Sequence, residues 1–241
     1  MVYRKSACYA WATFALLFIT MPAAAKEEIF VYGAQLEEFE YRRGSGSEKL
    51  LAWDGGAFAG NDDGKIHWLT EGAYDLNENT FAETENRLVA QIPVSMFFDV
   101  KAGVRLDTYS GGRERWYTVF GATGLAPQWF ELDADLFIGE SGRASTRLDA
   151  EYELLLTNRL FATFSMETTY SFAADKKVGI GTGVTDLEAG MRLSYDVIDR
   201  SVAPYIGVVY EKKYGDTGAM AREEDEADEE WLFVAGVRLM L

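Results

Sequence analysis

The sequence has very little of what metal sites and enzymes commonly use. Its 241 residues contain one cysteine, one histidine and four prolines. The histidine, His67, stands alone, and no Gly-x-Ser-x-Gly string supplies a nucleophile for it. We therefore predict that the protein is not an enzyme. After residue 25 there is also no run of about 18 apolar residues, which excludes a bundle of membrane-spanning helices.

Positive charge is scarce too. Asp and Glu number 39 against 23 Lys and Arg, and the formal net charge is −16. Nucleic acids and other polyanions are bound by basic surfaces. The composition therefore excludes nucleic acid as a partner and favours cations.

The first residues have the features of an export signal. Arg4 and Lys5 precede a mostly apolar stretch, and alanines at 23–25 supply a small-residue cleavage site. The apolar stretch is too short to span a membrane as a helix. We predict a signal peptide at 1–25 and one mature domain at 26–241.

The main pattern in the mature chain is an alternation with a period of two residues. Between residues 130 and 138, apolar and acidic side chains alternate almost without a break. Successive side chains of a β-strand point to opposite faces, so this segment has one apolar and one acidic face. The core of a soluble protein does not accept bare carboxylates, whereas a barrel with lipid outside and water inside accepts both faces. We predict an all-β fold, a transmembrane antiparallel β-barrel.

Turn signals divide the mature chain into about twelve strands. They are predicted at 30–43, 50–58, 65–76, 80–92, 97–109, 115–125, 129–139, 144–156, 160–172, 184–196, 203–214 and 231–241. The first three alternate poorly, which leaves ten strands as an alternative. An even number places both termini on the periplasmic side.

This topology places the longer links, 173–183 and 215–230, outside the cell. Aromatic residues near strand ends are typical of the girdles at the two membrane interfaces. The residues expected there are Trp116, Trp129, Phe130, Tyr205 and Trp231.

The predicted lumen is acidic. The inward carboxylates expected to contact cations are Glu131, Asp133, Asp135, Asp149, Glu151, Glu153, Asp186 and Glu188. Rings of Asp and Glu select cations in channels, which is one interpretation. The other is a lattice of salt bridges that fills a narrow barrel and leaves no continuous pore. Because acids outnumber bases, some carboxylates should remain available to cations.

His67 is the main candidate for a nitrogen ligand. Its parity places it with Glu71 on the lumen face, near the periplasmic mouth. One interpretation is a transient metal-binding or proton-sensitive point formed by His67 and Glu71. The alternative is a hydrogen-bonded histidine with a structural role only.

Several longer strings resemble the barrel domain of the copper resistance protein B family. They are AQLEEFEYRRG at 34–44, GLAPQWFELDADLFIGESG at 124–142, RLDAEYELLLTNRL at 147–160 and GIGTGVTDLEAGMRLSYD at 179–196. The resemblance implies a barrel in the outer membrane of a Gram-negative bacterium, surrounded by membrane lipid and lipopolysaccharide. It also implies copper ion as the cargo and periplasmic copper-handling proteins as partners in copper tolerance.

The sequence departs from that family in two places. Members usually carry a Met- and His-rich segment before the barrel, whereas the first predicted strand here begins almost at the cleavage site. This chain also ends in Leu241, where barrel-assembly signals usually end on an aromatic residue. Copper(I) prefers Cys and Met ligands and accepts His. No Met-x-x-Met string is present, so we expect only transient copper contacts.

Taken together, these patterns predict a narrow barrel with an acidic lumen that handles or passes copper in copper resistance and homeostasis. Two alternatives remain. One is a structural barrel that conducts nothing, and the other is a barrel hydrolase acting on lipid or peptide.

Overall fold

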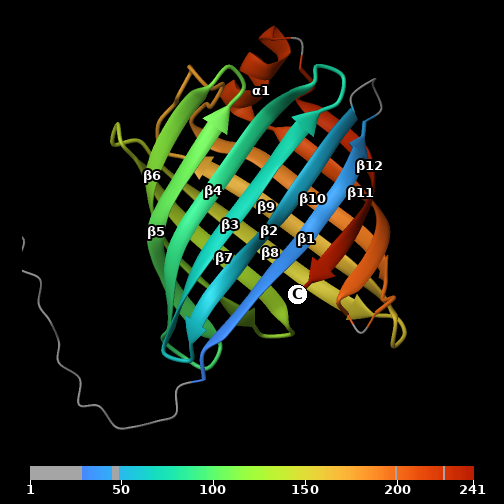
Figure 1. Ribbon diagram of the computed structural model, residues 1–241. Coiled ribbons are helices and arrows are strands. Elements are labelled where there is room, and N and C mark those ends of the chain that lie inside the picture. Colours follow the sequence, from blue (N-terminus) through green and yellow to red (C-terminus); the bar gives the residue numbers. More distant parts are fainter. Residues whose placement is uncertain (1–28, 45–48, 199, 225) are drawn as a thin grey trace, which may run out of the picture.

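The computed structural model describes residues 29–44, 49–198, 200–224 and 226–241, so the predicted signal peptide at 1–25 lies outside the described residues. This part of the chain forms twelve strands and one helix (Figure 1). They are β1 (Val31–Arg43), β2 (Lys49–Asn61), β3 (Gly64–Asp75), β4 (Thr80–Pro93), β5 (Phe98–Tyr109), β6 (Arg113–Ala126), β7 (Phe130–Gly139), β8 (Ala144–Leu155), β9 (Leu160–Ser171), β10 (Gly183–Tyr195), β11 (Val202–Lys213), α1 (Gly215–Glu223) and β12 (Glu229–Met240). No helix in these ranges is long and apolar enough to span a membrane.

The sheet closes on itself. Each strand pairs antiparallel with its neighbours in sequence, and β12 pairs with β1. Beyond the end of β12, the Leu241 N–H donates to the Ala34 carbonyl at 2.8 Å, and the Ala34 N–H donates back at 3.1 Å. Closure leaves no unpaired sheet edge, so the backbone polar groups need no partner from the surroundings. The predicted twelve-strand barrel is confirmed, and the alternative of ten strands is wrong.

β1 contains a β-bulge. Leu36 lies opposite Gly55 and Glu38 lies opposite Asp54, so Glu37 is an extra residue on β1. The register against β12 shifts at the same place. An extra residue reverses which face the following side chains occupy. Glu37 and Glu38 therefore both line the lumen, which explains why the sequence of this strand alternates poorly.

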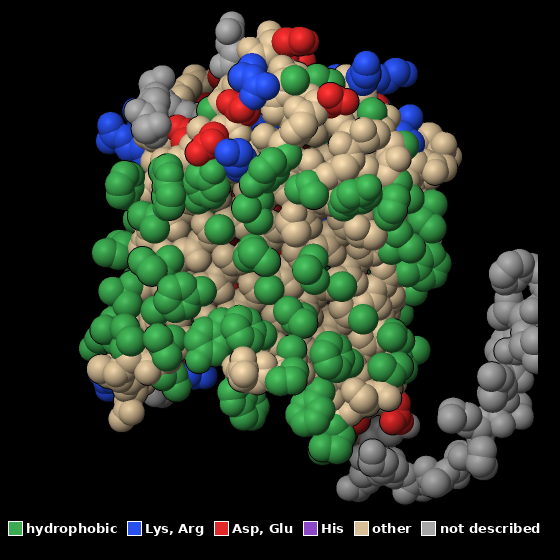
Figure 2. All heavy atoms as spheres, turned by 180° about the vertical axis from the view of Figure 1, so that it is seen from behind, with side chains coloured by type: hydrophobic (Ala, Val, Ile, Leu, Met, Phe, Trp, Pro, Cys, Tyr) green, Lys and Arg blue, Asp and Glu red, His purple; other side chains and the backbone are tan. Residues whose placement is uncertain are grey.

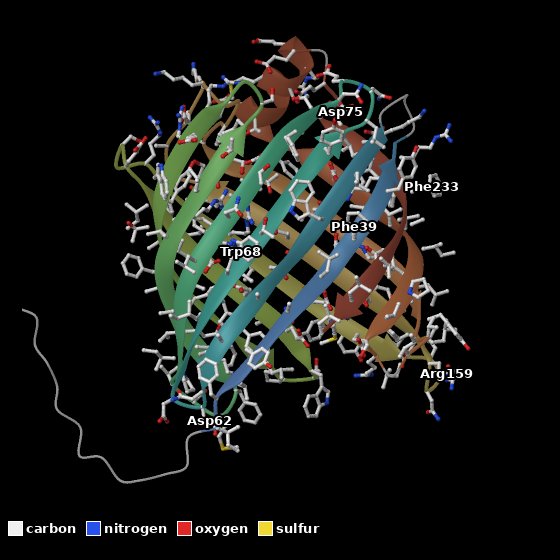
Figure 3. All side chains as sticks on the ribbon, viewed as in Figure 1. Phe39, Asp62, Trp68, Asp75, Arg159 and Phe233 are labelled. Atoms are coloured by element: carbon white, nitrogen blue, oxygen red, sulfur yellow. The ribbon has the colours of Figure 1, made fainter. Side chains whose placement is uncertain are left out.

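The outer wall of the barrel is apolar. Phe39, Trp68 and Phe233 lie along the wall of the barrel, while Asp62, Asp75 and Arg159 lie at its two ends (Figure 3). In the space-filling view, hydrophobic side chains cover the wall and charged side chains gather at the ends (Figure 2). An apolar belt between two charged ends is typical of a barrel surrounded by lipid.

Four of the five aromatic residues expected near strand ends are exposed on this wall. They are Trp116, Trp129, Phe130 and Trp231. The expectation for Tyr205 is wrong, because its side chain is only 5% exposed and packs inside the barrel. Side chains two residues apart share a face, so Tyr205 lies with Val209 on the lumen side. Parity, and not nearness to a strand end, decides its position.

Ion pairs cross the lumen between strands far apart in the barrel. The Arg147 guanidinium on β8 lies 3.2 Å from Glu71 Oε2 on β3 and 3.0 Å from Glu85 Oε2 on β4. Arg87 Nη1 on β4 lies 2.9 Å from Asp135 Oδ2 on β7. These contacts show that the lumen is narrow enough for charged side chains to bridge it.

One of the two fully buried acids, Glu40, is paired with two arginines. Glu40 is 0% exposed, and its Oε1 lies 3.0 Å from Arg192 Nη2 and 2.7 Å from Arg42 Nε. The same Arg192 atom lies 2.7 Å from Glu38 Oε2. A buried carboxylate is tolerated only with such partners, because an unpaired charge out of water is very costly. This cluster fastens β1 to β10.

The barrel end opposite the termini is covered. α1 lies across it (Figure 1), and the segment 172–182 is joined to α1 by a 2.9 Å hydrogen bond from the Gly181 N–H to Thr217 Oγ1. Asp175 Oδ2 holds this segment to the wall, 3.0 Å from Arg115 Nε and 2.8 Å from Arg143 Nη2. The link predicted at 215–230 begins with the helix α1.

Asp175 is held in its charged form. Partial burial alone would raise the pKa of its carboxyl group. The hydrogen bonds from Arg115 and from the Lys177 backbone, together with the charges of Arg115 and Arg143, hold the pKa below its ordinary value. A depressed pKa means that the contact is fully present above the ordinary aspartate range. It is lost only as the pH falls through the lowered value.

Replacing Arg192 by Met should destabilise the barrel strongly. The change leaves Glu40 with fewer cationic partners in a buried site, so we expect the free energy of unfolding to fall by about 3 kcal/mol. Urea unfolding followed by tryptophan fluorescence measures this. The control is Arg200→Ala, which removes an exposed pair with Glu153 and should cost less than about 1 kcal/mol. Equal costs for the two variants would contradict the account.

Replacing Asp175 by Asn should loosen the cover at this end of the barrel. Loss of the two arginine contacts should lower the local opening free energy by about 1 kcal/mol, which speeds amide exchange in 172–182 about fivefold. Hydrogen–deuterium exchange with mass spectrometry reports on that segment. Glu114→Gln, at an exposed position on the same end, should leave the exchange unchanged. Unchanged exchange in the Asp175 variant would show that the arginines do not hold the segment.

Candidate functional site: the lumen

The candidate site is the cavity inside the barrel. It has a volume of about 980 Å³ and extends from Met220 and Ala221 of α1 down to His67 and Glu131. Of the eight carboxylates predicted to face the lumen, seven line this cavity: Glu131, Asp133, Asp135, Asp149, Glu151, Asp186 and Glu188. The remaining one, Glu153, is paired instead with Arg200 at 3.1 Å and Arg238 at 3.5 Å.

Strand register arranges acids into a row on one half of the barrel. Residues directly opposite one another on β7 to β11 are Asp133, Asp149, Glu167, Glu188 and Glu211, in that order. Side chains of directly opposite residues are about 5 Å apart at Cβ, close enough for carboxylates to repel. We call this set the β7–β11 acidic row. Sequence alternation places each acid on the lumen face, but only the register aligns them.

The other half of the barrel has a second row. Glu38, Asp54, Glu71, Glu85 and Asp107 are directly opposite one another on β1 to β5. Strands of a barrel tilt by about 35–45° to its axis, so a row at right angles to the strands climbs along the axis. Both rows therefore rise from the lower lumen toward the covered end.

Most acids in the two rows are neutralised. Glu85 Oε2 lies 2.7 Å from Arg105 Nη2, and Asp107 Oδ1 lies 2.6 Å from Arg105 Nε. The Arg105 guanidinium also lies over the Phe137 ring, 4.4 Å from its centroid. Lys101 Nζ lies 2.6 Å from Asp133 and 3.0 Å from Asp135. The predicted salt-bridge lattice is therefore present, and Asp133 and Asp135 belong to it.

Several acids that line the cavity have no such partner among the described residues, Asp54 and Glu83 being two of them. Four others form a group. We call Glu37, Glu131, Asp149 and Glu151 the acidic patch. Glu131 lies directly opposite Glu151, and Glu37 on β1 is close enough to repel both. Within the described ranges, none of the four lies within 4.0 Å of a Lys or Arg nitrogen. The charge of Arg238 acts on Glu37 and Glu151 from beyond that distance.

The patch is an electrostatic site and not a fixed coordination sphere. No group of three or more His, Cys, Asp or Glu residues with metal-binding geometry occurs in the part of the chain that the structure describes. Carboxylate oxygens attract cations through their charge but bind copper(I) less well than soft ligands do.

The structure does not bring His67 and Glu71 together. Both face the cavity, but Glu71 is paired with Arg147, and the two residues are four positions apart on β3, about 13 Å along a strand. His67 stacks on Phe58 with ring centroids 5.5 Å apart. Its Nε2 has no hydrogen-bond partner among the described residues. His67 therefore lines the lumen apart from Glu71, and its Nε2 atom is buried.

Sequence analysis missed Glu37, Glu38 and Asp54 as lumen residues. The bulge at Glu37 shifts the parity of β1, and Asp54 lies in a stretch of β2 in which Leu, Trp, Gly and Ala obscure the alternation. The string of acids in β1 was the available signal. Reading it correctly requires the partner strand, because a bulge is defined by register.

Comparisons with known proteins agree with the sequence pattern. A family model for the copper resistance protein B precursor (CopB) matches residues 30–241. Copper resistance protein B of Escherichia coli is 36% identical over 208 residues, which cover 86% of this chain and 69% of that protein. The copper resistance protein B homolog of Pseudomonas syringae pv. tomato (strain ATCC BAA-871 / DC3000) is 36% identical over 192 residues, covering 78% of this chain and 63% of the homolog.

Solved structures give the same fold at low identity. A NanC porin structure is 13% identical and aligns with a TM-score of 0.52 over 88% of this chain and 100% of that chain. At this identity the likeness shows the fold alone. The match over residues 30–241, with two relatives at 36% identity, shows more: the chain belongs to the copper resistance protein B family.

Proposed function

We propose that this protein is an outer-membrane barrel of a Gram-negative bacterium that contributes to copper tolerance by admitting copper ions to its lumen. The observation that carries the proposal is the acidic patch of Glu37, Glu131, Asp149 and Glu151. Carboxylates without cationic partners inside a low-dielectric wall raise the local concentration of cations. Family membership supplies copper as the relevant cation.

Location in the outer membrane is supported by three features. The outer wall is apolar with charged ends, the sheet is closed, and residues 1–25 have the sequence pattern predicted for an export signal. Membrane lipid and lipopolysaccharide are then its surroundings. The covered end carrying α1 faces outward, and the end with the termini faces the periplasm.

Copper ions reach the lumen from the periplasmic end. The acidic patch lies in the half of the barrel nearer the termini, whereas α1 and 172–182 cover the other end. A periplasmic copper-handling protein is the partner that would deliver the ion. His67 adds a nitrogen donor on the same side, and the carboxylates hold the ion in exchange without chemical conversion. The role is therefore that of a non-enzymatic copper-handling barrel.

A structural barrel that conducts nothing is the second candidate. The ion pairs that Arg147 makes with Glu71 and Glu85 across the lumen favour it, since they occupy space that a permeating ion needs. The two candidates differ in what the unpaired carboxylates do. In a purely structural barrel, their removal relieves repulsion and leaves copper handling unchanged.

Neutralising three residues of the acidic patch should weaken copper handling. In a strain lacking the gene, the wild-type gene should restore growth and cellular copper under copper stress, measured by elemental analysis. The variant E131Q/D149N/E151Q should fail to do so, with copper binding to the purified barrel about tenfold weaker or more. The control E78Q/E114Q/E223Q removes the same charge at exposed positions outside the lumen. Equal rescue by both variants would contradict the proposal.

Replacing His67 by Ala should remove the one imidazole of the lumen. We expect weaker copper(II) binding to the purified barrel and loss of nitrogen hyperfine structure from its electron paramagnetic resonance spectrum. Gln91→Ala changes a nearby lumen side chain that hydrogen-bonds Asp99 and serves as the control. Unchanged spectra and unchanged copper tolerance in the His67 variant would assign this histidine a structural role only.

A further inference from the structure

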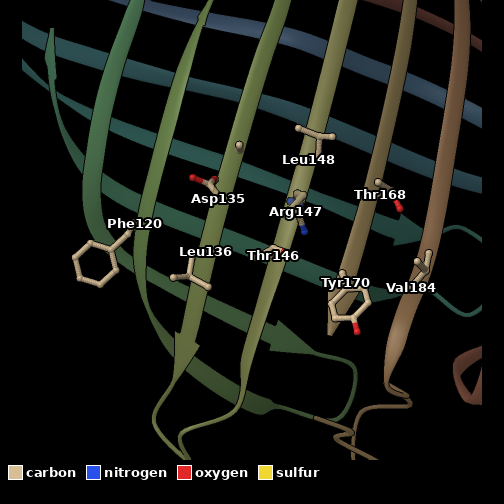
Figure 4. A pocket seen from close by; sticks show the side chains of 10 residues that line it. Phe120, Asp135, Leu136, Thr146, Arg147, Leu148, Thr168, Tyr170 and Val184 are labelled. Carbon is tan, nitrogen blue, oxygen red and sulfur yellow. The ribbon is translucent and has the colours of Figure 1, made fainter. Parts of the chain in front are cut away.

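The apolar wall has a hollow over β6 to β10. Its volume is about 420 Å³, and Phe120, Leu136, Thr146, Leu148 and Tyr170 are among its lining residues (Figure 4). Phe120, Leu136, Thr146 and Tyr170 are consecutive partners in one register row across four strands. The hollow forms because the side chains of Ala134, Thr146 and Thr168 are small. The neighbouring side chains of Phe120, Leu136, Leu148 and Tyr170 are large.

The hollow is suited to hydrocarbon. Phe120, Leu148 and Tyr170 are 49%, 42% and 44% exposed on the outer wall. The Thr168 hydroxyl donates to the Asp186 carbonyl at 2.8 Å, so it does not require a partner from outside. The lining residues Asp135 and Arg147 direct their charges to ion pairs in the lumen. A dry cavity of about 150 Å³ accommodates one benzene molecule, so this hollow accommodates a longer hydrocarbon segment.

The hollow lies just inside the covered end of the barrel. Thr146 is the third residue of β8, Tyr170 is the second from the end of β9, and Val184 is the second residue of β10. At about 3.3 Å per residue, the hollow begins within about 7 Å of the strand ends. With that end facing outward, the hollow lies at the depth of the outer leaflet.

The rim above the hollow is basic, although the protein as a whole is acidic. The connections 110–115, 140–143 and 172–182 carry five cationic residues against three acids, namely Arg113, Arg115, Arg143, Lys176 and Lys177 against Glu114, Glu140 and Asp175. Arg113, Lys176 and Lys177 are exposed. On the other side, the described residues of 214–230 carry seven acids and one arginine. Anionic headgroups are therefore attracted to one side of the rim only.

We propose that the hollow and the basic rim together form a binding site for a phosphorylated lipid of the outer leaflet. One acyl chain lies in the hollow between Phe120 and Tyr170, and the phosphate is held by the exposed Arg113, Lys176 and Lys177. Apolar burial and charge attraction act at once on a lipid that has both groups. The site rests on the outer-membrane location and not on copper handling, so failure of the copper tests leaves it unaffected.

The test uses the full mature barrel in detergent, incubated with lipid A or with fully dephosphorylated lipid A, and counts bound lipid by native mass spectrometry. Wild type should retain one lipid A in preference to the dephosphorylated form. T146F fills the hollow and should weaken retention of both forms about tenfold, as expected for displacing a few methylenes. A102F adds the same ring at an exposed outer-wall position on β5 and should change nothing. If T146F does not fold, A134F fills the hollow from β7.

The charge variant separates the rim from the hollow. K176E/K177E should lower the preference for the phosphorylated form about tenfold and leave retention of the dephosphorylated form unchanged. R43E/K49E reverses two exposed charges at the same end, on β1 and β2, and is the control. The site is refuted if T146F and A134F bind like A102F. It is also refuted if K176E/K177E discriminates between the two lipids like wild type.

Discussion

Each charged side chain on the inner wall of this barrel must be either paired or hydrated, because an unpaired charge out of water is very costly. The outer wall is apolar and cannot supply a partner. That requirement explains the buried Glu40 with its two arginines and the Arg147 contacts that cross the lumen. It also explains why acids without an ion pair, such as Glu131, Asp149 and Glu151, line the central cavity. Closure of β1 on β12 is what separates the two environments.

The two acidic rows show how register turns alternation into an electrostatic feature. Alternation alone puts acids on one face of each strand. Register then places five of them side by side on β7–β11 and five on β1–β5. Like charges directly opposite one another are destabilising, so the rows persist only with interleaved arginines and lysines. Where those bases are missing, the remaining field acts on mobile cations. Asp149 belongs both to the β7–β11 acidic row and to the acidic patch on which the proposed function rests.

The barrel is also asymmetric along its axis and around its rim. One end is covered by α1 and the segment that Asp175 fastens, while the acidic patch lies toward the other end. Around the covered rim, basic residues stand above β6 to β9 and acidic residues accompany α1. Under the proposed function, the first asymmetry gives cations a preferred side of entry. The second gives the lipid-facing wall a preferred side for anionic headgroups.

Sequence alone could predict the fold class, the twelve strands and the lumen face of most acids, because each follows from local alternation and turn signals. Seven of the eight predicted carboxylates line the cavity for this reason. Sequence could not predict the bulge at Glu37, since it depends on the partner strand, and it misplaced Tyr205 because nearness to a strand end was weighed above parity. The sequence also could not predict which acids are neutralised by a nearby base. Arg147 and Glu71 are 76 residues apart, and only closure brings them together.

The central claim is that unpaired lumen carboxylates make this barrel attractive to cations. The most direct measurement is the reversal potential of the purified protein in a planar lipid bilayer under a salt gradient. The account predicts a current whose reversal potential has the sign of cation preference. Absence of current, or a reversal potential with the sign of anion preference, would contradict it.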